Sequence, residues 1–202
     1  MLTIITPATA AALTTLDAVK RDLDITGTEE DAALADLIAQ ASASLSSWIG
    51  RPLVRETVRQ TWRLNQRLPA LTLDRVPVAG ITSVMVKGVT VSPEAVECDN
   101  EAGVAYSLDN IGFYQPWPAG VITITYAGGW IPPGADGRDL PADIEAACIA
   151  LVRRAYHQKG RDPALKGLDV GSIKLDWLVP GGDPMPAEVV PVVDRYRIFG
   201  GW

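Results

Sequence analysis

The residues best suited to chemistry in this chain lie in a short loop, GADGRDLP, and in one helix-like segment. Asp136 and Asp139 in the loop could act as a general acid and base, provided that burial raised the pKa of one of them. Nothing in the sequence indicates such burial. Asp136 followed by glycine is typical of a turn, and Asp139, two residues before Pro141, is typical of a cap on the helix that follows.

The single histidine, His157, stands beside Arg154 and Lys159 in the last turn of a predicted helix. This position is typical of a surface or helix-capping histidine. Cys98 and Cys148 lie 50 residues apart without a CxxC pair, so we expect buried, reduced thiols. Phosphate-loop, dinucleotide-binding, nucleophile-elbow and zinc-protease motifs do not occur. We therefore predict no catalytic residues, no metal site, no cofactor and no enzyme.

Composition predicts a soluble globular chain with a core of its own. The 202 residues are 48% hydrophobic and 21% charged. No apolar run approaches the roughly 20 residues that cross a bilayer, and the N-terminus lacks the basic region of a secretory signal, so we expect no membrane contact.

The net charge of −6 is distributed in blocks along the chain. Residues 51–77 hold six basic and two acidic residues, whereas residues 1–50 and 78–140 each hold two basic and seven acidic ones. This pattern favours electrostatic matching between protein surfaces over non-specific nucleic-acid binding.

Three helices are predicted from apolar residues at helical spacing. The first covers residues 15–23 after a Thr15 cap, and the second begins near Thr28 and Asp31 and ends at Ile49 before Gly50. The third covers residues 141–159, and its apolar stripe matches that of the second, so we expect the two to pack together.

The pattern changes to period two in VRETVRQTWRL, which predicts a strand. Arg55, Arg59 and Arg63 then share one face and span about 13 Å. The face is either a solvated sheet surface or a contact with an acidic protein neighbour, which we favour over DNA.

Further short strands are predicted over residues 71–74, 81–88, 89–91, 95–99, 104–108 and 121–127. The last loop between them, DNIGFYQPWPAG, carries Phe113, Tyr114 and Trp117. These aromatic residues either contact a partner or cap the core of their own sheet.

We therefore predict an α+β fold in one domain. Residues 1–50 and 132–160 would form a helical bundle, and residues 51–131 an antiparallel β insertion. Residues 161–202 would form an extended C-terminal arm with a short helix at 187–196. We expect this arm to become ordered when it binds a partner. In the joining stretch, Gly128 and Gly129 turn the backbone and two prolines end the strand.

The order of these elements resembles the head-to-tail connector, or adaptor, proteins of long-tailed bacteriophages and gene transfer agents. Three segments carry the resemblance: LTTLDAVKRDLDITGTEEDAALADLIAQASASLSSWIGRPL, ITITYAGGW with LPADIEAACIALVRRAYHQKG, and VVDRYRIF. It implies a non-catalytic structural virion protein of the neck, assembled in the host bacterial cytoplasm.

The resemblance also implies partners. Such proteins form a homo-oligomeric ring, usually of 12 copies, below the portal protein, extend the DNA channel without sequence-specific DNA binding, and present the surface on which the tail docks through a terminator or stopper protein. Their C-terminal segment typically attaches to the portal. We hypothesise that the Arg55, Arg59 and Arg63 face contacts the next subunit or the portal. The portal anchors would come from the C-terminal residues Tyr196, Arg197, Phe199 and Trp202.

Two alternatives remain open. The chain could be another phage neck or tail-completion protein, which would bind the tail tube or terminator. It could also be a small carbohydrate-binding or hydrolytic module with the FYQPW aromatics as a platform; saturable binding of a small ligand would distinguish that class.

Overall fold

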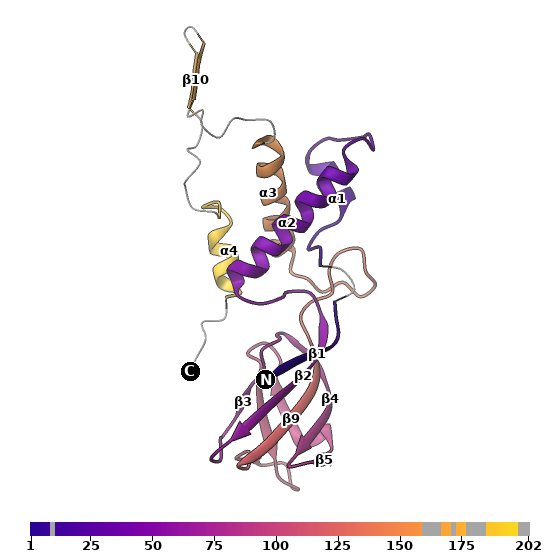
Figure 1. Cartoon of the computed structure of the whole chain (residues 1–202), viewed down its shortest axis with the longest axis vertical. Coiled ribbons are helices and arrows are strands. Elements are labelled where there is room, and N and C mark those ends of the chain that lie inside the picture. Colours follow the sequence, from indigo (N-terminus) through magenta and orange to yellow (C-terminus); the bar gives the residue numbers. More distant parts are fainter. Residues whose placement is uncertain (9–10, 159–166, 171–172, 177–184, 198–202) are drawn as a thin grey trace. The chain divides into compact units, whose positions relative to one another are not determined.

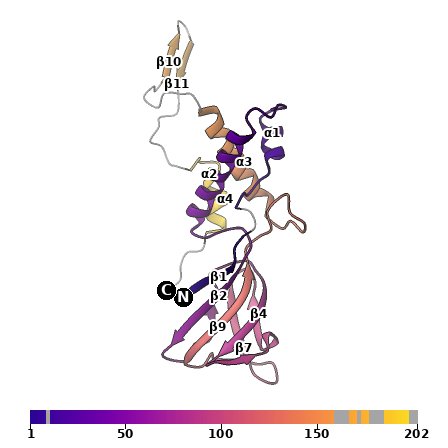
Figure 2. The ribbon, with the colours of Figure 1, turned by 45° about the vertical axis from the view of Figure 1, so that its right-hand side comes forward.

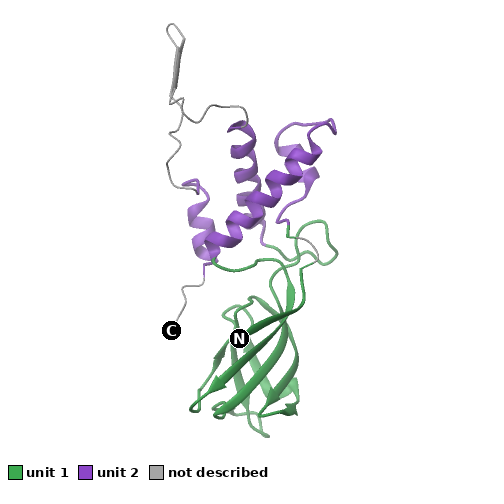
Figure 3. Cartoon of the chain, in the orientation of Figure 1, with its two compact units in different colours: residues 1–11, 50–140 green, residues 12–49, 141–202 purple. Residues whose placement is uncertain are grey.

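The chain folds into two compact units (Figure 3). The computed structural model describes residues 1–8, 11–158, 167–170, 173–176 and 185–197. Residues 1–11 and 50–140 form the first, here called the β unit, and residues 12–49 with the C-terminal part from 141 onward form the second, here called the helical unit.

The larger sheet of the β unit is antiparallel and five-stranded, in the order β1-β2-β9-β4-β5 (Figure 1). Its strands are β1 (Leu2–Thr6), β2 (Glu56–Leu64), β9 (Gly120–Gly128), β4 (Val78–Val86) and β5 (Val89–Val91). The period-two pattern of residues 54–64 predicted β2, and Thr57, Arg59 and Arg63 do lie on its more exposed side. The N-terminal strand β1 was not predicted, because its five residues carry too short a pattern to identify.

A smaller antiparallel sheet faces the first (Figure 2). Its order is β3-β7-β6, with β8 paired to β7. These elements are β3 (Leu71–Thr72), β6 (Val96–Asp99), β7 (Val104–Leu108) and β8 (Tyr114–Gln115), and a 3-10 turn, η1 (Pro93–Ala95), precedes β6.

The core of the β unit lies between these two sheets. Val58, Ile122 and Ile124 reach it from the five-stranded sheet, and Leu71 and Ala105 from the smaller one. All five side chains are at most 2% exposed. Alternating residues of each strand therefore point either into this core or outward, which fixes two outer faces.

The helical unit contains α1 (Leu16–Asp22), α2 (Asp31–Ile49), α3 (Ala142–Gln158) and α4 (Val190–Arg195). The three predicted helices are confirmed within one or two residues at each end. Thr15 caps α1 by accepting a hydrogen bond from the amide of Ala18, and Gly50 follows α2 with φ +86°. A two-stranded antiparallel hairpin, β10 (Gly167–Val170) and β11 (Ile173–Asp176), follows α3 in the chain. No helix among the described residues is long and apolar enough to span a bilayer.

Side-chain contacts hold the helical unit together. Ser42, on α2, is 1% exposed; its hydroxyl accepts a hydrogen bond from the amide of Leu13 at 3.0 Å and lies 3.6 Å from Sγ of Cys148 on α3. Arg153 on α3 pairs with Asp22 at the end of α1. The sequence pattern did not predict this role of Ser42.

The predicted fold class is wrong. The chain is a strand-rich mixed α/β fold with antiparallel sheets, and among the residues that the structure describes only α1, α2 and α3 are sizeable helices. Residues 1–50 contribute β1 to a sheet as well as two helices, so they are not part of a helical bundle alone. The physical reason is that β1 pairs with β2, more than 50 residues away in the chain, and that two antiparallel sheets enclose a core of their own.

Candidate functional site

The loop with Asp136 and Asp139 has a structural role, because Asp139 binds groups on neighbouring segments. The Asp139 carboxylate forms an ion pair with Arg55 and accepts a hydrogen bond from the amide of Ile131, while Nε of Arg55 donates to the carbonyl of Gly129 at 3.1 Å. The prediction that Asp139 caps the following helix is therefore wrong, because both of these partners lie outside α3. Asp136 is exposed.

The glycine pair before this loop is required by close backbone approach. Gly129 has φ +100°, and a Cβ there would lie 2.8 Å from the carbonyl oxygen of Val54. A Cβ on Gly128 would lie 2.3 Å from the carbonyl oxygen of Arg75. The two glycines therefore allow the end of β9 to pack directly against the backbone at Val54 and at Arg75. They also turn the chain, as the sequence predicted.

The remaining groups with possible chemistry are placed apart. His157 is exposed at the end of α3, with its ring edge-on to Tyr156 at 5.7 Å between centroids. Cys148 is buried and Cys98 half-buried, and burial raises the pKa of each thiol to about 11. A neutral thiol is a poor nucleophile and metal ligand. Among the described residues, no three His, Cys, Asp or Glu side chains cluster as a metal site would require.

A buried polar network that the sequence did not reveal lies inside the β unit. The Tyr126 hydroxyl donates to Oε1 of Gln60 at 2.8 Å and accepts from the amide of Arg75 at 3.1 Å. Oε1 of Gln60 also accepts from the amide of Asp74, and Arg75 pairs with the buried Glu56. Burial is the main cause that raises the pKa of Tyr126 to about 12. The network joins β2 and β9 to the segment after β3, so its role is structural.

The predicted arginine stripe is divided between two roles. Arg55 precedes β2 and is held by Asp139 and Gly129, whereas Arg59 and Arg63 are exposed on the outer side of the five-stranded sheet. Within the described part of the chain, neither Arg59 nor Arg63 has a side-chain hydrogen bond or ion pair.

We call the outer side of the five-stranded sheet the basic face. The strand registers place Thr3 and Thr125 beside Arg59, and Val121 beside Arg63. Its members are Thr3, Thr57, Arg59, Thr61, Arg63, Ser83, Met85, Thr90, Val121, Thr123, Thr125 and Ala127. The two arginines are the charged residues of this set, so the face is positive.

The aromatic residues of the FYQPW loop do not share one surface. Trp117 is 1% exposed and its indole N–H donates to the carbonyl of Ala105 at 3.0 Å, so it belongs to the core and cannot contact a partner. Phe113 and Tyr114 are 68% and 64% exposed. Asp109 holds the preceding loop by accepting hydrogen bonds from the amides of Ile111 and Phe113. The three aromatics therefore do not form one platform for a sugar.

We call the outer side of the smaller sheet the acidic face. Glu97 and Asp99 alternate on β6 with the half-buried Val96 and Cys98, which pack on the core. The register places Tyr106 beside Glu97, and the Tyr106 ring contacts that of Tyr114 with centroids 5.1 Å apart. A hydrogen bond to the Glu97 carboxylate is the main cause that raises the pKa of Tyr114. The face consists of Glu97, Asp99, Val104, Tyr106, Leu108 and Tyr114, with Phe113 next to Tyr114.

Of the predicted C-terminal anchors, two lie among the described residues. The Tyr196 hydroxyl donates to the Asp143 carboxylate, at 2.9 and 3.0 Å from its two oxygens, which ties the end of α4 to the start of α3. Arg197 is exposed. Phe199 and Trp202 lie outside the described residues.

Comparison with solved structures identifies similar folds. The neck of an empty gene transfer agent (GTA) particle computed with C6 symmetry contains a chain that matches with 20% identity and a TM-score of 0.61. The neck of the native particle computed with C12 symmetry gives 20% and 0.58, and the virion of the native particle gives 20% and 0.59. Each match covers 100% of this chain and 98% of the other. The fold is therefore shared over the whole length.

The sequence itself matches a protein family. No curated protein matches the chain. The sequence profile of the head completion protein family matches residues 12–167, which include α2, α3 and both sheets apart from β1. The predicted resemblance and the predicted structural role as a head-to-tail connector are thereby confirmed: the chain belongs to the head completion protein family.

Proposed function

We propose that this protein forms a ring in the neck of a phage or GTA particle, below the portal protein. There it extends the DNA channel and presents the surface on which the tail docks through a terminator or stopper protein. The observation that carries the proposal is the family match over residues 12–167. The shared fold with chains from GTA necks computed with C6 and C12 symmetry supports a closed ring, with 12 copies in the particle.

In this role the protein has no catalytic activity and binds no cofactor. It contacts DNA only as the wall of a channel, without reading its sequence. Assembly takes place in the host bacterial cytoplasm, and the final location is the virion. The division of the chain into a β unit and a helical unit supports a structural role, because each unit offers separate surfaces for neighbouring proteins.

Deleting the gene tests this function. We expect heads that fill with DNA but carry no tail, and electron microscopy of the lysate counts them. Purified full-length protein added to these heads should restore tail joining. Tailed, infectious or gene-transferring particles in the deletion strain would refute the proposal.

The C-terminal segment is the proposed portal attachment. The structure narrows the residues to remove, because Val189 and Val193 are buried and Tyr196 bonds to Asp143, so deleting residues 187–202 would damage the helical unit. Ending the chain after Arg197 removes Phe199 and Trp202 and spares these contacts. We expect the shortened protein to keep its melting temperature and to stop sedimenting with portal-bearing heads. Undiminished co-sedimentation would contradict the attachment.

A further inference from the structure

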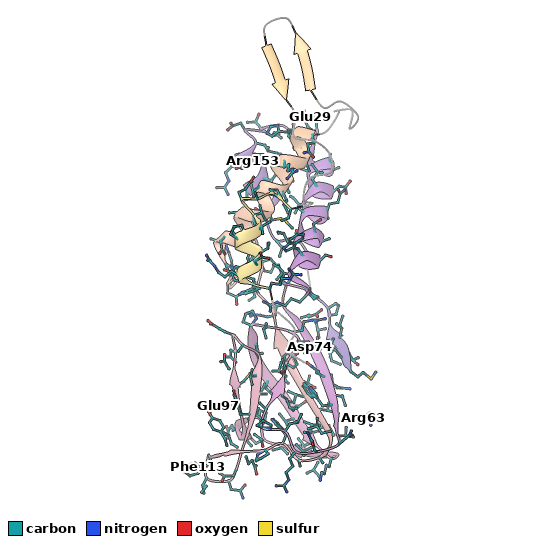
Figure 4. The ribbon with its side chains drawn as sticks, turned by 90° about the vertical axis from the view of Figure 1, so that its left-hand side faces the viewer. Glu29, Arg63, Asp74, Glu97, Phe113 and Arg153 are labelled. Atoms are coloured by element: carbon teal, nitrogen blue, oxygen red, sulfur yellow. The ribbon has the colours of Figure 1, made fainter. Side chains whose placement is uncertain are left out.

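The β unit carries opposite charges on opposite sides. The basic face and the acidic face are the outer sides of two sheets that enclose one core, and packed sheets lie about 10 Å apart. Figure 4 shows Arg63 on one side of the β unit, and Glu97 and Phe113 on the other. One copy of the chain therefore presents positive charge in one direction and negative charge in the opposite one.

Both faces also contain exposed apolar side chains beside their charges. On the basic face, Met85 and Val121 are 39% and 38% exposed. On the acidic face, Phe113 and Tyr114 are exposed next to Glu97. Aromatic residues, methionine and arginine are the types enriched in protein interfaces. The apolar groups matter because exposed ion pairs alone contribute little to association.

The two faces match each other chemically. A guanidinium group binds carboxylates through its fork of N–H donors and also stacks on aromatic rings. The acidic face offers both partners side by side, carboxylates at Glu97 and Asp99 and rings at Tyr106 and Tyr114. Arg59 and Arg63 have no side-chain partner within the described part of their own chain, so they are available to another copy.

We propose that the basic face of one copy docks on the acidic face of the next copy around the ring. This inference rests on the proposed function and names the surfaces that join its subunits. Charge also selects the arrangement, because two basic or two acidic faces repel one another and only unlike faces attract. A contact between two different faces is heterologous, and repetition of such a contact closes into a ring when the rotation per subunit allows it.

Charge reversal of each face provides the test. The first variant carries Arg59→Glu and Arg63→Glu, and the second carries Glu97→Arg and Asp99→Arg. All four residues are exposed, and thermal melting checks that each variant is folded. We expect the melting temperature of the first variant to be unchanged. That of the second should fall by a few degrees, because the Asp99 carboxylate accepts hydrogen bonds from the amides of Glu101 and Ala102, and the Glu97 carboxylate accepts one from Tyr114. Arg21→Glu, an exposed reversal on α1, is the control for altered net charge.

The full-length proteins are added to tailless heads from the deletion strain, and tailed particles are counted. Reversal of close charge pairs costs more than the 1.4 kcal/mol that corresponds to tenfold in affinity, so we expect each variant alone to lower tail joining at least about tenfold. The control should match the unaltered protein.

An equal mixture of the two variants should restore tail joining to within about threefold, because every contact in an alternating ring again joins unlike charges. A single chain with all four reversals should also restore it, since its own two faces are complementary once more. Unchanged activity of either variant alone, or failure of both rescues while the unaltered protein works, would overturn this interface. Failure of the unaltered protein itself would instead overturn the proposed function.

Discussion

Removal of one buried hydroxyl should loosen the two sheets that present the charged faces. In Tyr126→Phe, the amide of Arg75 loses its acceptor at 3.1 Å and Gln60 loses a donor at 2.8 Å. Gln60 keeps the amide of Asp74 as a second donor, so the Arg75 amide is the group left without a partner. A lost hydrogen bond contributes about 1 kcal/mol and an unsatisfied buried group costs about 1–3 kcal/mol more. We therefore expect a loss of about 2–4 kcal/mol in unfolding free energy at pH 8.

The same side chain predicts how this loss depends on pH. Burial raises the pKa of Tyr126 from 10.0 to about 12 in the folded state, so the folded protein holds this proton more tightly than the unfolded chain. The resulting stability is complete below about pH 10 and disappears as pH rises through 12. Each pKa unit corresponds to 1.36 kcal/mol, so the shift of about two units allows a total loss of about 3 kcal/mol. About 2 kcal/mol of this advantage of the unaltered protein should disappear between pH 10 and 12.

Urea unfolding followed by circular dichroism at pH 8, 10 and 12 measures both effects. Other groups that titrate in this range, including Cys98 and Cys148, are present in both proteins and cancel in the difference. Tyr106→Phe, on the outer face, is the matched control and should change stability by less than about 0.5 kcal/mol. A Tyr126→Phe loss below about 0.5 kcal/mol at pH 8, or one that stays constant up to pH 12, would refute the network as described.

Three further sets of substitutions test contacts that hold the fold together, each measured by urea unfolding. Gly129→Ala should lower the unfolding free energy by more than about 3 kcal/mol, because the new Cβ would lie 2.8 Å from a backbone oxygen. Gly88→Ala is the control: at φ +83° and with open space around it, it should lose only the left-handed backbone penalty of about 1–2 kcal/mol. Equal losses for the two variants would contradict the close backbone approach at Gly129. Ser42→Ala should cost about 1–3 kcal/mol by leaving a buried amide without an acceptor, and a neutral result would exclude that role. A double-mutant cycle of Asp139→Ala and Arg55→Ala should give a coupling free energy of about 1 kcal/mol or less, which decreases in 1 M salt because the ion pair is partly exposed. A coupling free energy that does not depend on salt would contradict an ion pair between these side chains.

Local patterns predicted the individual elements well. The helical stripe of residues 31–49 and the alternation of residues 56–64 identified α2 and β2, because the backbone repeat of each element is contained in a short window of sequence. The same alternation placed Arg59 and Arg63 together on an exposed face. The fold class failed for the opposite reason: pairing of β1 with β2 joins segments more than 50 residues apart, and no local repeat specifies it.

For the candidate surfaces too, local sequence patterns were informative and long-range contacts could not be predicted. The sequence left open whether Phe113, Tyr114 and Trp117 face a partner or the core, and the structure separates them, since Trp117 bonds to β7 inside the core while the other two are exposed. Arg55 shared the pattern of Arg59 and Arg63, yet its partner Asp139 lies 84 residues away in the chain. Specific long-range partners of this kind have no signature in residue spacing.

The sequence by itself determined that charge is distributed in blocks, with residues 51–77 basic and residues 78–140 acidic, and that the family is that of head completion proteins. Only the tertiary structure decided on which surfaces these charged residues lie. The β unit places Arg59 and Arg63 on one sheet and Glu97 and Asp99 on the sheet that faces it, so the charges emerge on opposite sides of a common core. The physical reason is that composition sets how much charge a segment carries, whereas strand pairing and the packing of two sheets set the direction in which that charge points.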